Sequence, residues 1–273
     1  MGDNNAVTMA PSAAVARRRR ERQVRLGWQV AALVALVAGM YALNAAAGKL
    51  VMPSPNDVVL ASIKMWGDGS MLTGLGQTLT VLVLGFVISA VTGIIGGVLL
   101  GGFRRLGEIL DPFVNAINAT PGAAFIPLII VWFGLYTEAK VVLVWNAAFF
   151  PILINTTAGV ASTNRDLVEM ARAFGASRVK LFWQVMLPDA IPSILSGLRI
   201  GAAVSTVGTV IAELTMAQSG LGGLLATAGN RFQMDKYFAV VIVLMILGTL
   251  ITIALRFAER RLARWRVALN EER

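Results

Sequence analysis

The stretch GSMLTGLGQTLTVLVLGFVISAVTGIIGGVLLGGF, residues Gly69 to Phe103, carries no charged side chain. A helix of roughly 20 residues crosses the hydrocarbon core of a bilayer, so this stretch is long enough to span it. A spanning segment must bond its own backbone because lipid offers no hydrogen-bond partner. The sequence therefore predicts a membrane-spanning helix here.

Small residues recur every four positions in this stretch. Gly93, Gly97 and Gly101 continue a series begun by Gly85 and Ser89, so they fall on one face of a helix. Small residues at this spacing let two membrane helices approach closely. We expect helix packing at this face; a generic glycine-rich membrane helix is the alternative interpretation.

The composition of the whole chain fits a membrane protein. Of 273 residues, 56% are apolar and 14% charged, with a mean hydropathy of +0.71, whereas soluble domains carry about 25% charged residues. The chain has no Cys and no His, which excludes disulfides, thiol and imidazole catalysis and Cys/His metal sites. We expect no metal and no cofactor.

Further apolar stretches predict five more spans, for six in an all-α membrane protein. They are Leu26 to Gly48, Pro112 to Thr137, Val141 to Asn164, Ile194 to Met216 and Tyr237 to Leu255. The first could resemble a cleaved signal sequence, but its apolar run exceeds the roughly 7 to 15 residues of a signal peptide core. We interpret it as a retained span.

The distribution of basic residues predicts the orientation. With a cytoplasmic N-terminus, 19 of the 24 Lys and Arg lie on the inner side and 5 on the outer side, as positive loops prefer. Both termini are then cytoplasmic. We expect a disordered basic leader (1–25), one transmembrane domain (26–266) and a short tail (267–273). The run Arg17 to Arg20 could bind nucleic acid, but a topogenic flank explains it without a nucleic-acid partner.

Two prolines interrupt the predicted third span. Pro121 and Pro127 remove backbone donors, which predicts a kink or break near residues 119–124. Broken membrane helices often line substrate paths. A purely structural kink is the alternative.

The predicted fifth span holds a carboxylate, Glu213. A charge at the centre of a membrane helix costs about 2.5–3.5 kcal/mol on insertion scales, so this side chain should face the interior. It is a candidate for the translocation path or a gate, and Ser205 and Thr209 on the same helix could line the path too. The alternative is a structural hydrogen bond between Glu213 and a neighbouring Ser, Thr or Asn.

The sequence of the loop 161–190, between the fourth and fifth spans, predicts two short helices joined by a glycine turn. The first helix would begin at Thr163 or Asn164, and Gly175 can adopt the positive φ that ends it. Ser177 can cap the second helix, which Pro188 should stop. Apolar residues at helical spacing give each helix one apolar face: Leu167, Met170, Ala171 and Phe174 in the first, and Val179, Phe182, Trp183 and Met186 in the second.

Helices this short are marginal in water, so something must cover their apolar faces. The chain's own spans could supply part of the cover, and a groove on a partner protein the rest. An amphipathic loop lying on lipid is the alternative.

The same loop carries a family resemblance. Glu169-Met-Ala-Arg-Ala-Phe-Gly175, followed by Leu187-Pro188, resembles the EAA signature of ABC importer permeases, with Met170 at the first alanine position. Other segments are similar to the nitrate, sulfonate and taurine branch of these permeases: Ile126 to Gly134, Phe149 to Asn155, Gly197 to Arg199, Ala212-Glu213 and Ser219 to Gly222.

The resemblance implies a type I importer permease of the bacterial inner membrane whose loop supplies coupling helices. It implies that two permease copies work with ATP-binding cassette ATPases and an extracytoplasmic binding protein, on a small, anionic solute such as a sulfonate, taurine or nitrate. The surface that docks on the ATPase would be formed by Leu167, Met170, Phe174 and Phe182. Glu169 and Arg172 would orient this docking surface, and Gly175 would allow the turn. Ala171, Leu187 and Pro188 complete the signature.

The chain has no phosphate-binding loop of the form G-x-x-x-x-G-K-[ST], so it cannot hydrolyse ATP through one. We expect a non-catalytic subunit driven by partner ATPases. A gradient-driven carrier or channel acting alone is the alternative, although one membrane carboxylate is thin support for it. An intramembrane enzyme would need paired catalytic groups that the spans do not contain.

Overall fold

The computed structural model describes residues 11–216 and 219–262, and the regular elements in those ranges are all helical. Five of these helices are long and apolar enough to cross a membrane, and a sharply bent helix pair counts as a sixth crossing. The predicted all-α membrane fold is confirmed, and the six predicted spans fit this count with the bent pair taken as one span.

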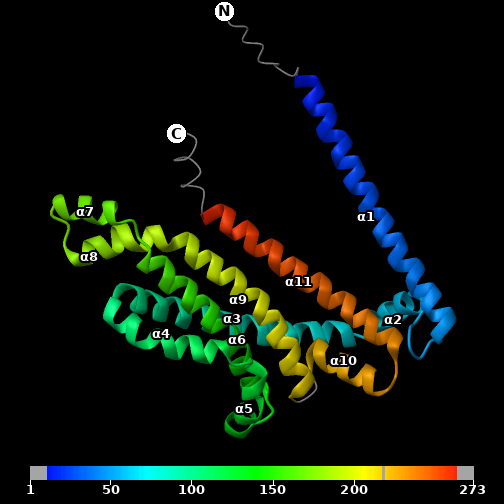
Figure 1. The fold of residues 1–273 in the computed structure, drawn as a ribbon. Helices are drawn as coiled ribbons and strands as arrows, with labels where there is room; N and C mark the ends of the chain where they lie inside the picture. The colour runs from blue at the N-terminus through cyan, green and yellow to red at the C-terminus, as the bar shows by residue number, and fades with distance from the viewer. Residues whose placement is uncertain (1–10, 217–218, 263–273) are drawn as a thin grey trace, which may run out of the picture.

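Three long helices form the centre of the molecule. α3 (Ser70–Gly102) and α9 (Leu187–Thr215) both pack along α6 (Thr137–Ala161) (Figure 1). α11 (Met234–Leu262) lies along α9, and its lower end meets α2 (Pro55–Gly67) and α10 (Gly220–Asn230). The centre is therefore a bundle with two short helices at one end.

The first helix stands apart from this bundle. α1 (Pro11–Ala47) extends away from the other helices and meets them only near α2 (Figure 1). In the most apolar stretch of α1, no residue is buried by the rest of the chain, as expected for a helix surrounded by lipid. α1 also includes residues 11–25, which the sequence predicted as disordered; the Arg and Ala residues abundant there favour helix. The predicted tail (267–273) lies outside the described residues.

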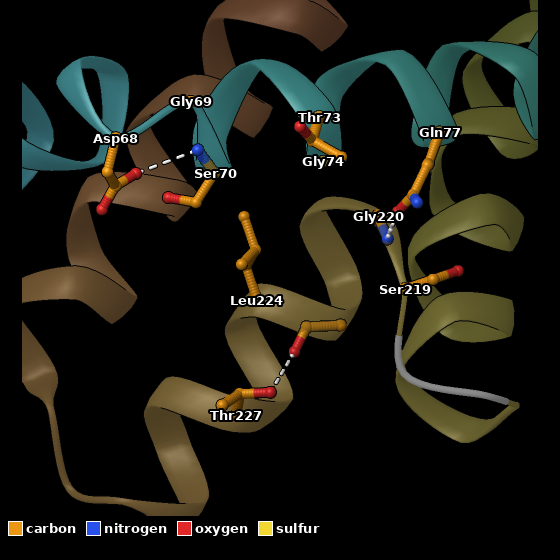
Figure 2. A pocket seen from close by; sticks show the side chains of 11 residues that line it. Asp68, Gly69, Ser70, Thr73, Gly74, Gln77, Ser219, Gly220, Leu224 and Thr227 are labelled. Carbon is orange, nitrogen blue, oxygen red and sulfur yellow. Dashed lines mark hydrogen bonds between the residues drawn. The ribbon is translucent and has the colours of Figure 1, made fainter.

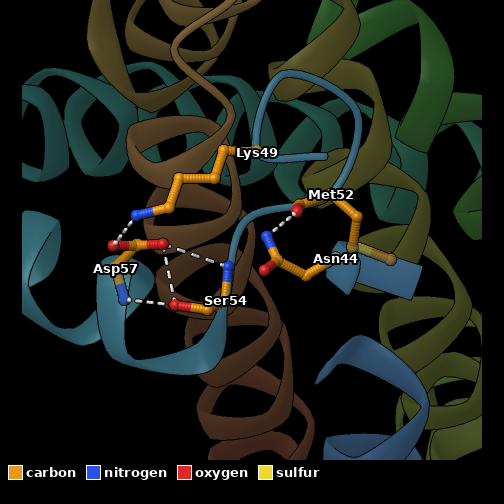
Figure 3. A network of polar contacts seen from close by, with 5 residues as sticks. All are labelled: Asn44, Lys49, Met52, Ser54 and Asp57. Atoms are coloured by element: carbon orange, nitrogen blue, oxygen red, sulfur yellow. Dashed lines mark hydrogen bonds and ion pairs between the residues drawn. The ribbon is translucent and has the colours of Figure 1, made fainter. Parts of the chain in front are cut away.

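The beginning of α2 is fixed by a local polar network (Figure 3). The Ser54 hydroxyl accepts a hydrogen bond from the Asp57 backbone N–H (3.2 Å), and the Asp57 carboxylate accepts from the Ser54 hydroxyl (2.7 Å) and backbone N–H (3.3 Å). This is a capping box, with an ion pair from Lys49 to Asp57 at 3.3 Å. The Ser54 hydroxyl and Lys49 together lower the pKa of Asp57 below its ordinary value.

The third span is broken, as its prolines predicted. α4 (Arg104–Ala119) is followed by a short 3-10 helix (Gly122–Phe125) and α5 (Ile126–Phe133), and the two arms meet at 87°. The predicted start at Pro112 was wrong: α4 begins eight residues earlier and contains Pro112. Uncharged stretches alone cannot locate this start, because α4 carries charged residues on one of its faces.

The loop between α6 and α9 extends from one end of the bundle (Figure 1). It contains α7 (Arg165–Ala173), α8 (Arg178–Leu181) and a π-helical turn (Phe182–Met186) that continues into α9. α10 and the α10–α11 turn lie at the other end of the bundle.

Candidate functional site

The end of α7 is built around Gly175. The Asn164 side chain caps the start of the helix by accepting from the Asp166 backbone N–H at 2.9 Å. At the other end, the Gly175 N–H bonds to the Arg172 carbonyl (2.9 Å) and the Ala176 N–H to the Ala171 carbonyl (3.0 Å). This pair of bonds is a Schellman motif, which requires the positive φ of +77° that Gly175 adopts. The turn therefore depends on glycine.

The second helix of the loop differs from the prediction. Ser177 caps it, its hydroxyl accepting from the Lys180 backbone N–H at 3.3 Å, but Pro188 does not stop it. The chain passes through the π turn, where the Leu187 N–H bonds to the Phe182 carbonyl, and continues as α9. Pro188 lies in the first turn of α9, directly after this wider turn, where its missing N–H removes no regular α-helical bond. The expected stop at Pro188 was wrong for this reason.

The loop presents a run of apolar side chains to its surroundings. Phe174 is 86% exposed, and Trp183 is 62% exposed. Others of this set are Leu167, Met170 and Val179. Glu169 and Arg172 are exposed beside them, and Ala171 is half-buried. Exposed apolar side chains gathered in this way are typical of a surface that contacts another protein or the membrane.

Other predicted members of the loop face inward. Phe182 and Leu187 pack with Met186 against a buried cluster that includes Val160 and Ala190. A Cβ at Gly102 of α3 would lie 3.3 Å from the Phe182 ring. Phe182 and Leu187 therefore anchor the loop to the bundle, and Leu167, Met170 and Phe174 are left to form the outer surface.

The glycine face of α3 packs directly on α6. Cβ atoms added at Gly93, Gly97 and Gly101 would lie 3.2, 2.7 and 2.8 Å from backbone carbonyl oxygens of α6. The side chains opposite them are spaced by four residues as well: Ile152, Thr156 and Val160. Backbone atoms cannot yield to a methyl group, so these glycines set the distance between the two helices.

The predicted path residues of α9 lie inside the single chain. Ser205, Thr209 and Glu213 are completely buried. The Ser205 and Thr209 hydroxyls donate to carbonyls of their own helix, at 2.8 Å each. The Glu213 carboxylate accepts from the Thr78 hydroxyl at 2.9 Å, a contact of the kind that the structural alternative described. That these residues line a path stays a prediction.

The prolines predicted for the path flank the break in the third span. Pro121 precedes the 3-10 helix, and Pro127 lies in the first turn of α5. Both positions tolerate proline because the first N–H groups of a helix have no partner within it. The break therefore costs little backbone bonding.

Sequence reasoning missed a polar face on α4. Arg104, Glu108, Asp111, Asn115 and Asn118 occur at i, i+4, i+7, i+11 and i+14, and all five are exposed in the single chain. Arg104 pairs with Glu108 at 2.8 Å. This spacing was the signal that could have revealed the face, which the predicted start at Pro112 had split.

A cavity of about 730 Å³ opens at the base of this polar face. It lies between α4, the end of α3 and α6, and its lining residues include Arg104, Glu108, Asp111, Thr157 and Met186. The cavity brings the polar face of α4 close to Met186, at the point where the exposed loop joins α9.

These features define a multi-pass helical membrane protein with a broken span and an exposed apolar loop at one end. Comparison with known proteins identifies the family. Residues 89–264 match the model of the binding-protein-dependent transport system inner membrane component. The chain belongs to this family.

Named relatives cover nearly the whole chain. It is 32% identical to the taurine transport system permease protein TauC of Escherichia coli K12, over 89% of this chain and 90% of the relative. It is 31% identical to the putative aliphatic sulfonates transport permease protein SsuC of Bacillus subtilis 168, over 91% and 92%. The predicted resemblance is thereby confirmed.

A solved structure supports the fold. The inward-facing MetNI methionine ABC transporter matches with a TM-score of 0.60 and 23% identity, over 68% of this chain and 93% of that chain. The protein is thus a non-catalytic permease subunit of the inner membrane, from a family whose systems work with ATPase subunits and binding proteins. Family membership argues against a carrier that acts alone.

Proposed function

We propose that this chain forms the membrane path of an importer for a small sulfonate, with taurine as the first solute to test. The support is the named function of its relatives, which are permeases for taurine and for aliphatic sulfonates. Selection of the solute would rest mainly with the binding protein. Binding of solutes to the partner binding protein, measured by calorimetry, tests this; a partner that binds nitrate but no sulfonate would refute it.

The single observation that carries the coupling role is the exposed apolar surface of the α7–α8 loop. Phe174 leaves 86% of its surface uncovered at a glycine turn that the fold builds with specific hydrogen bonds. An exposed aromatic side chain of this size is typical of the centre of a protein interface. We assign this surface to the ATPase subunit, so that movement of the ATPase is passed through Phe182 and Leu187 into α9.

The orientation follows from the charge count and the six crossings. Nineteen inner basic residues against five outer ones favour cytoplasmic termini, and four crossings then bring the loop to the cytoplasm. α2 and α10 would face the binding protein. Ala173→Cys tests this, because Ala173 is exposed at the end of α7 and the chain has no cysteine of its own. Its labelling by an impermeant reagent from the outside of intact cells would refute the orientation.

The polar face of α4 supports a dimer with a central path. Charged and amide side chains within a membrane face a protein interior or a water-filled cavity. In the single chain this face is exposed, so a second copy of the chain would enclose it. Single cysteines at Asn115 and Asn118 should react with small water-soluble thiol reagents, whereas one at Ile109, on the apolar side of α4, should not. The reverse pattern would contradict a path along α4.

A further inference from the structure

The first turn of α10 is held by side chains from other helices. The first N–H groups of a helix have no partner within it. In α10 the three that follow Ser219 bond to side chains of α3 and α9, with Gly220 donating to Gln77 Oε1 (2.7 Å), Leu221 to Thr78 Oγ1 (2.8 Å) and Gly222 to Glu213 Oε2 (2.9 Å). The cap of this helix is therefore tertiary.

Glu213 is the central group of this cap. Its carboxylate is completely buried and accepts from the Thr78 hydroxyl as well as from the Gly222 N–H. The Thr78 hydroxyl oxygen accepts in turn from the Leu221 N–H, so one threonine links the carboxylate to α10. The partial positive charge of a helix N-terminus favours a carboxylate in this position.

A lysine from a third helix completes the cluster. Lys140 of α6 is 2% exposed, and its ammonium donates to the hydroxyl of Ser219, the residue that precedes α10. Lys140 and Glu213 therefore place two buried groups of opposite charge beside the start of α10. The start of α10 is thus tied to α3, α6 and α9 together.

Two glycines of the 219–222 segment make room for the carboxylate. Gly220 has φ +74°, and a Cβ there would overlap the Glu213 carboxylate. A Cβ at Gly222 would lie 2.6 Å from Glu213 Cβ and 3.0 Å from the Val210 carbonyl oxygen. The cap therefore explains why glycine is needed at positions 220 and 222.

The cap also forms one end of a cavity. A hollow of about 430 Å³ lies between the start of α3 and α10, lined by residues that include Ser70, Gln77, Gly220 and Thr227. Figure 2 shows the side chains that line it. Gln77 and Gly220 meet at its edge, as the figure shows. α10 also packs through Leu221 and Leu225 in a buried apolar cluster with Met71 of α3, and the cap adds directed hydrogen bonds to this packing at the start of α10.

We propose that Glu213 is a positioning residue that holds α10 in register with α3, α6 and α9, so that this end of the permease moves as one body during transport. The proposal rests on the transport function above. In this role Glu213 acts on transport through the position of α10 and does not contact the solute, because its carboxylate is already bonded to Thr78 and Gly222.

The position of α10 can be measured without transport. Spin labels on Leu72→Cys of α3 and Asn230→Cys of α10 use two exposed sites in a chain that lacks cysteine. The distance distribution should be narrow in the parent and broad in Glu213→Ala. Thr78→Val, which removes one hydroxyl, should broaden it too if Glu213→Ala fails to fold. Thr80→Val is the matched control, because this exposed hydroxyl of α3 bonds only to its own helix in the structure.

Transport by the complete importer supplies the readout that a passive packing role would not change. Glu213→Gln and Lys140→Met should each lower uptake at least about tenfold, since each removes one of two buried, oppositely charged groups at the start of α10 and leaves the other behind. The double variant should recover most of the loss, because it removes both charges and keeps a hydrogen-bond acceptor for Gly222.

The outcomes separate the two proposals. Native distances and native uptake in Glu213→Ala and Thr78→Val, or a double variant no better than either single one, would overturn the positioning role. Failure of the parent importer to move any sulfonate would overturn the proposed solute instead, and the spin-label distances would still judge the cap.

Discussion

Replacing Phe174 by Ala should weaken the complex with the ATPase subunit about 30-fold. Full burial of a Phe side chain contributes about 1.5–3 kcal/mol. Because 86% of Phe174 is uncovered in the single chain, nearly all of this gain remains available for docking. A loss of about 2 kcal/mol corresponds to about 30-fold in Kd. Titration of purified permease in nanodiscs with labelled ATPase subunit measures it.

The matched control for this prediction is Phe232→Ala. Phe232 is 68% exposed and lies in the α10–α11 turn, at the other end of the bundle (Figure 1). Its loss should leave the Kd within about twofold, since exposed substitutions outside an interface rarely exceed about 0.5 kcal/mol. Equal effects of the two variants, or none for Phe174→Ala, would refute the assignment of the α7–α8 surface.

Three further predictions concern the turn, the bundle and the α2 cap. Gly175→Val should abolish ATP-driven uptake while membrane insertion, followed by fractionation, stays normal, because the turn needs a positive φ; unchanged uptake would contradict it. Gly97→Ala should lower the free energy of unfolding in detergent by about 1–3 kcal/mol, as followed by thermal denaturation. Gly76→Ala should leave it unchanged, because a Cβ at Gly76 would have no neighbouring atom within 4 Å. By NMR, the pKa of the Asp57 carboxyl should lie below its ordinary range and should rise in Ser54→Ala. The cap is then intact above the pKa of the unfolded chain and is lost as pH falls through the lowered pKa of the folded chain. A titration midpoint of Asp57 at its ordinary value would contradict this.

The fold was largely predictable because a membrane imposes a simple length rule. Uncharged stretches located the spans, and Pro121 and Pro127 located the break. The boundary of α4 was missed because a rule that excludes charges cannot recognise a spanning helix with one polar face. The effect of Pro188 was missed because a π turn depends on packing around Phe182 that local sequence does not encode.

The candidate site was predictable in its local parts. The cap at Asn164 and the turn at Gly175 follow from nearby residues, whereas the inward position of Phe182 depends on α3. The cap of α10 joins Thr78 to Glu213 across 135 positions in the chain. A single sequence shows that Glu213 needs a partner, but only the fold shows which one.

ATP-driven uptake in proteoliposomes tests the central claim most directly. The account predicts that the chain, its ATPase subunit and the solute-loaded binding protein together accumulate labelled taurine or another sulfonate. Omission of the ATPase or of ATP should stop the uptake. Uptake of the solute by the purified chain alone, with no ATPase present, would contradict the account.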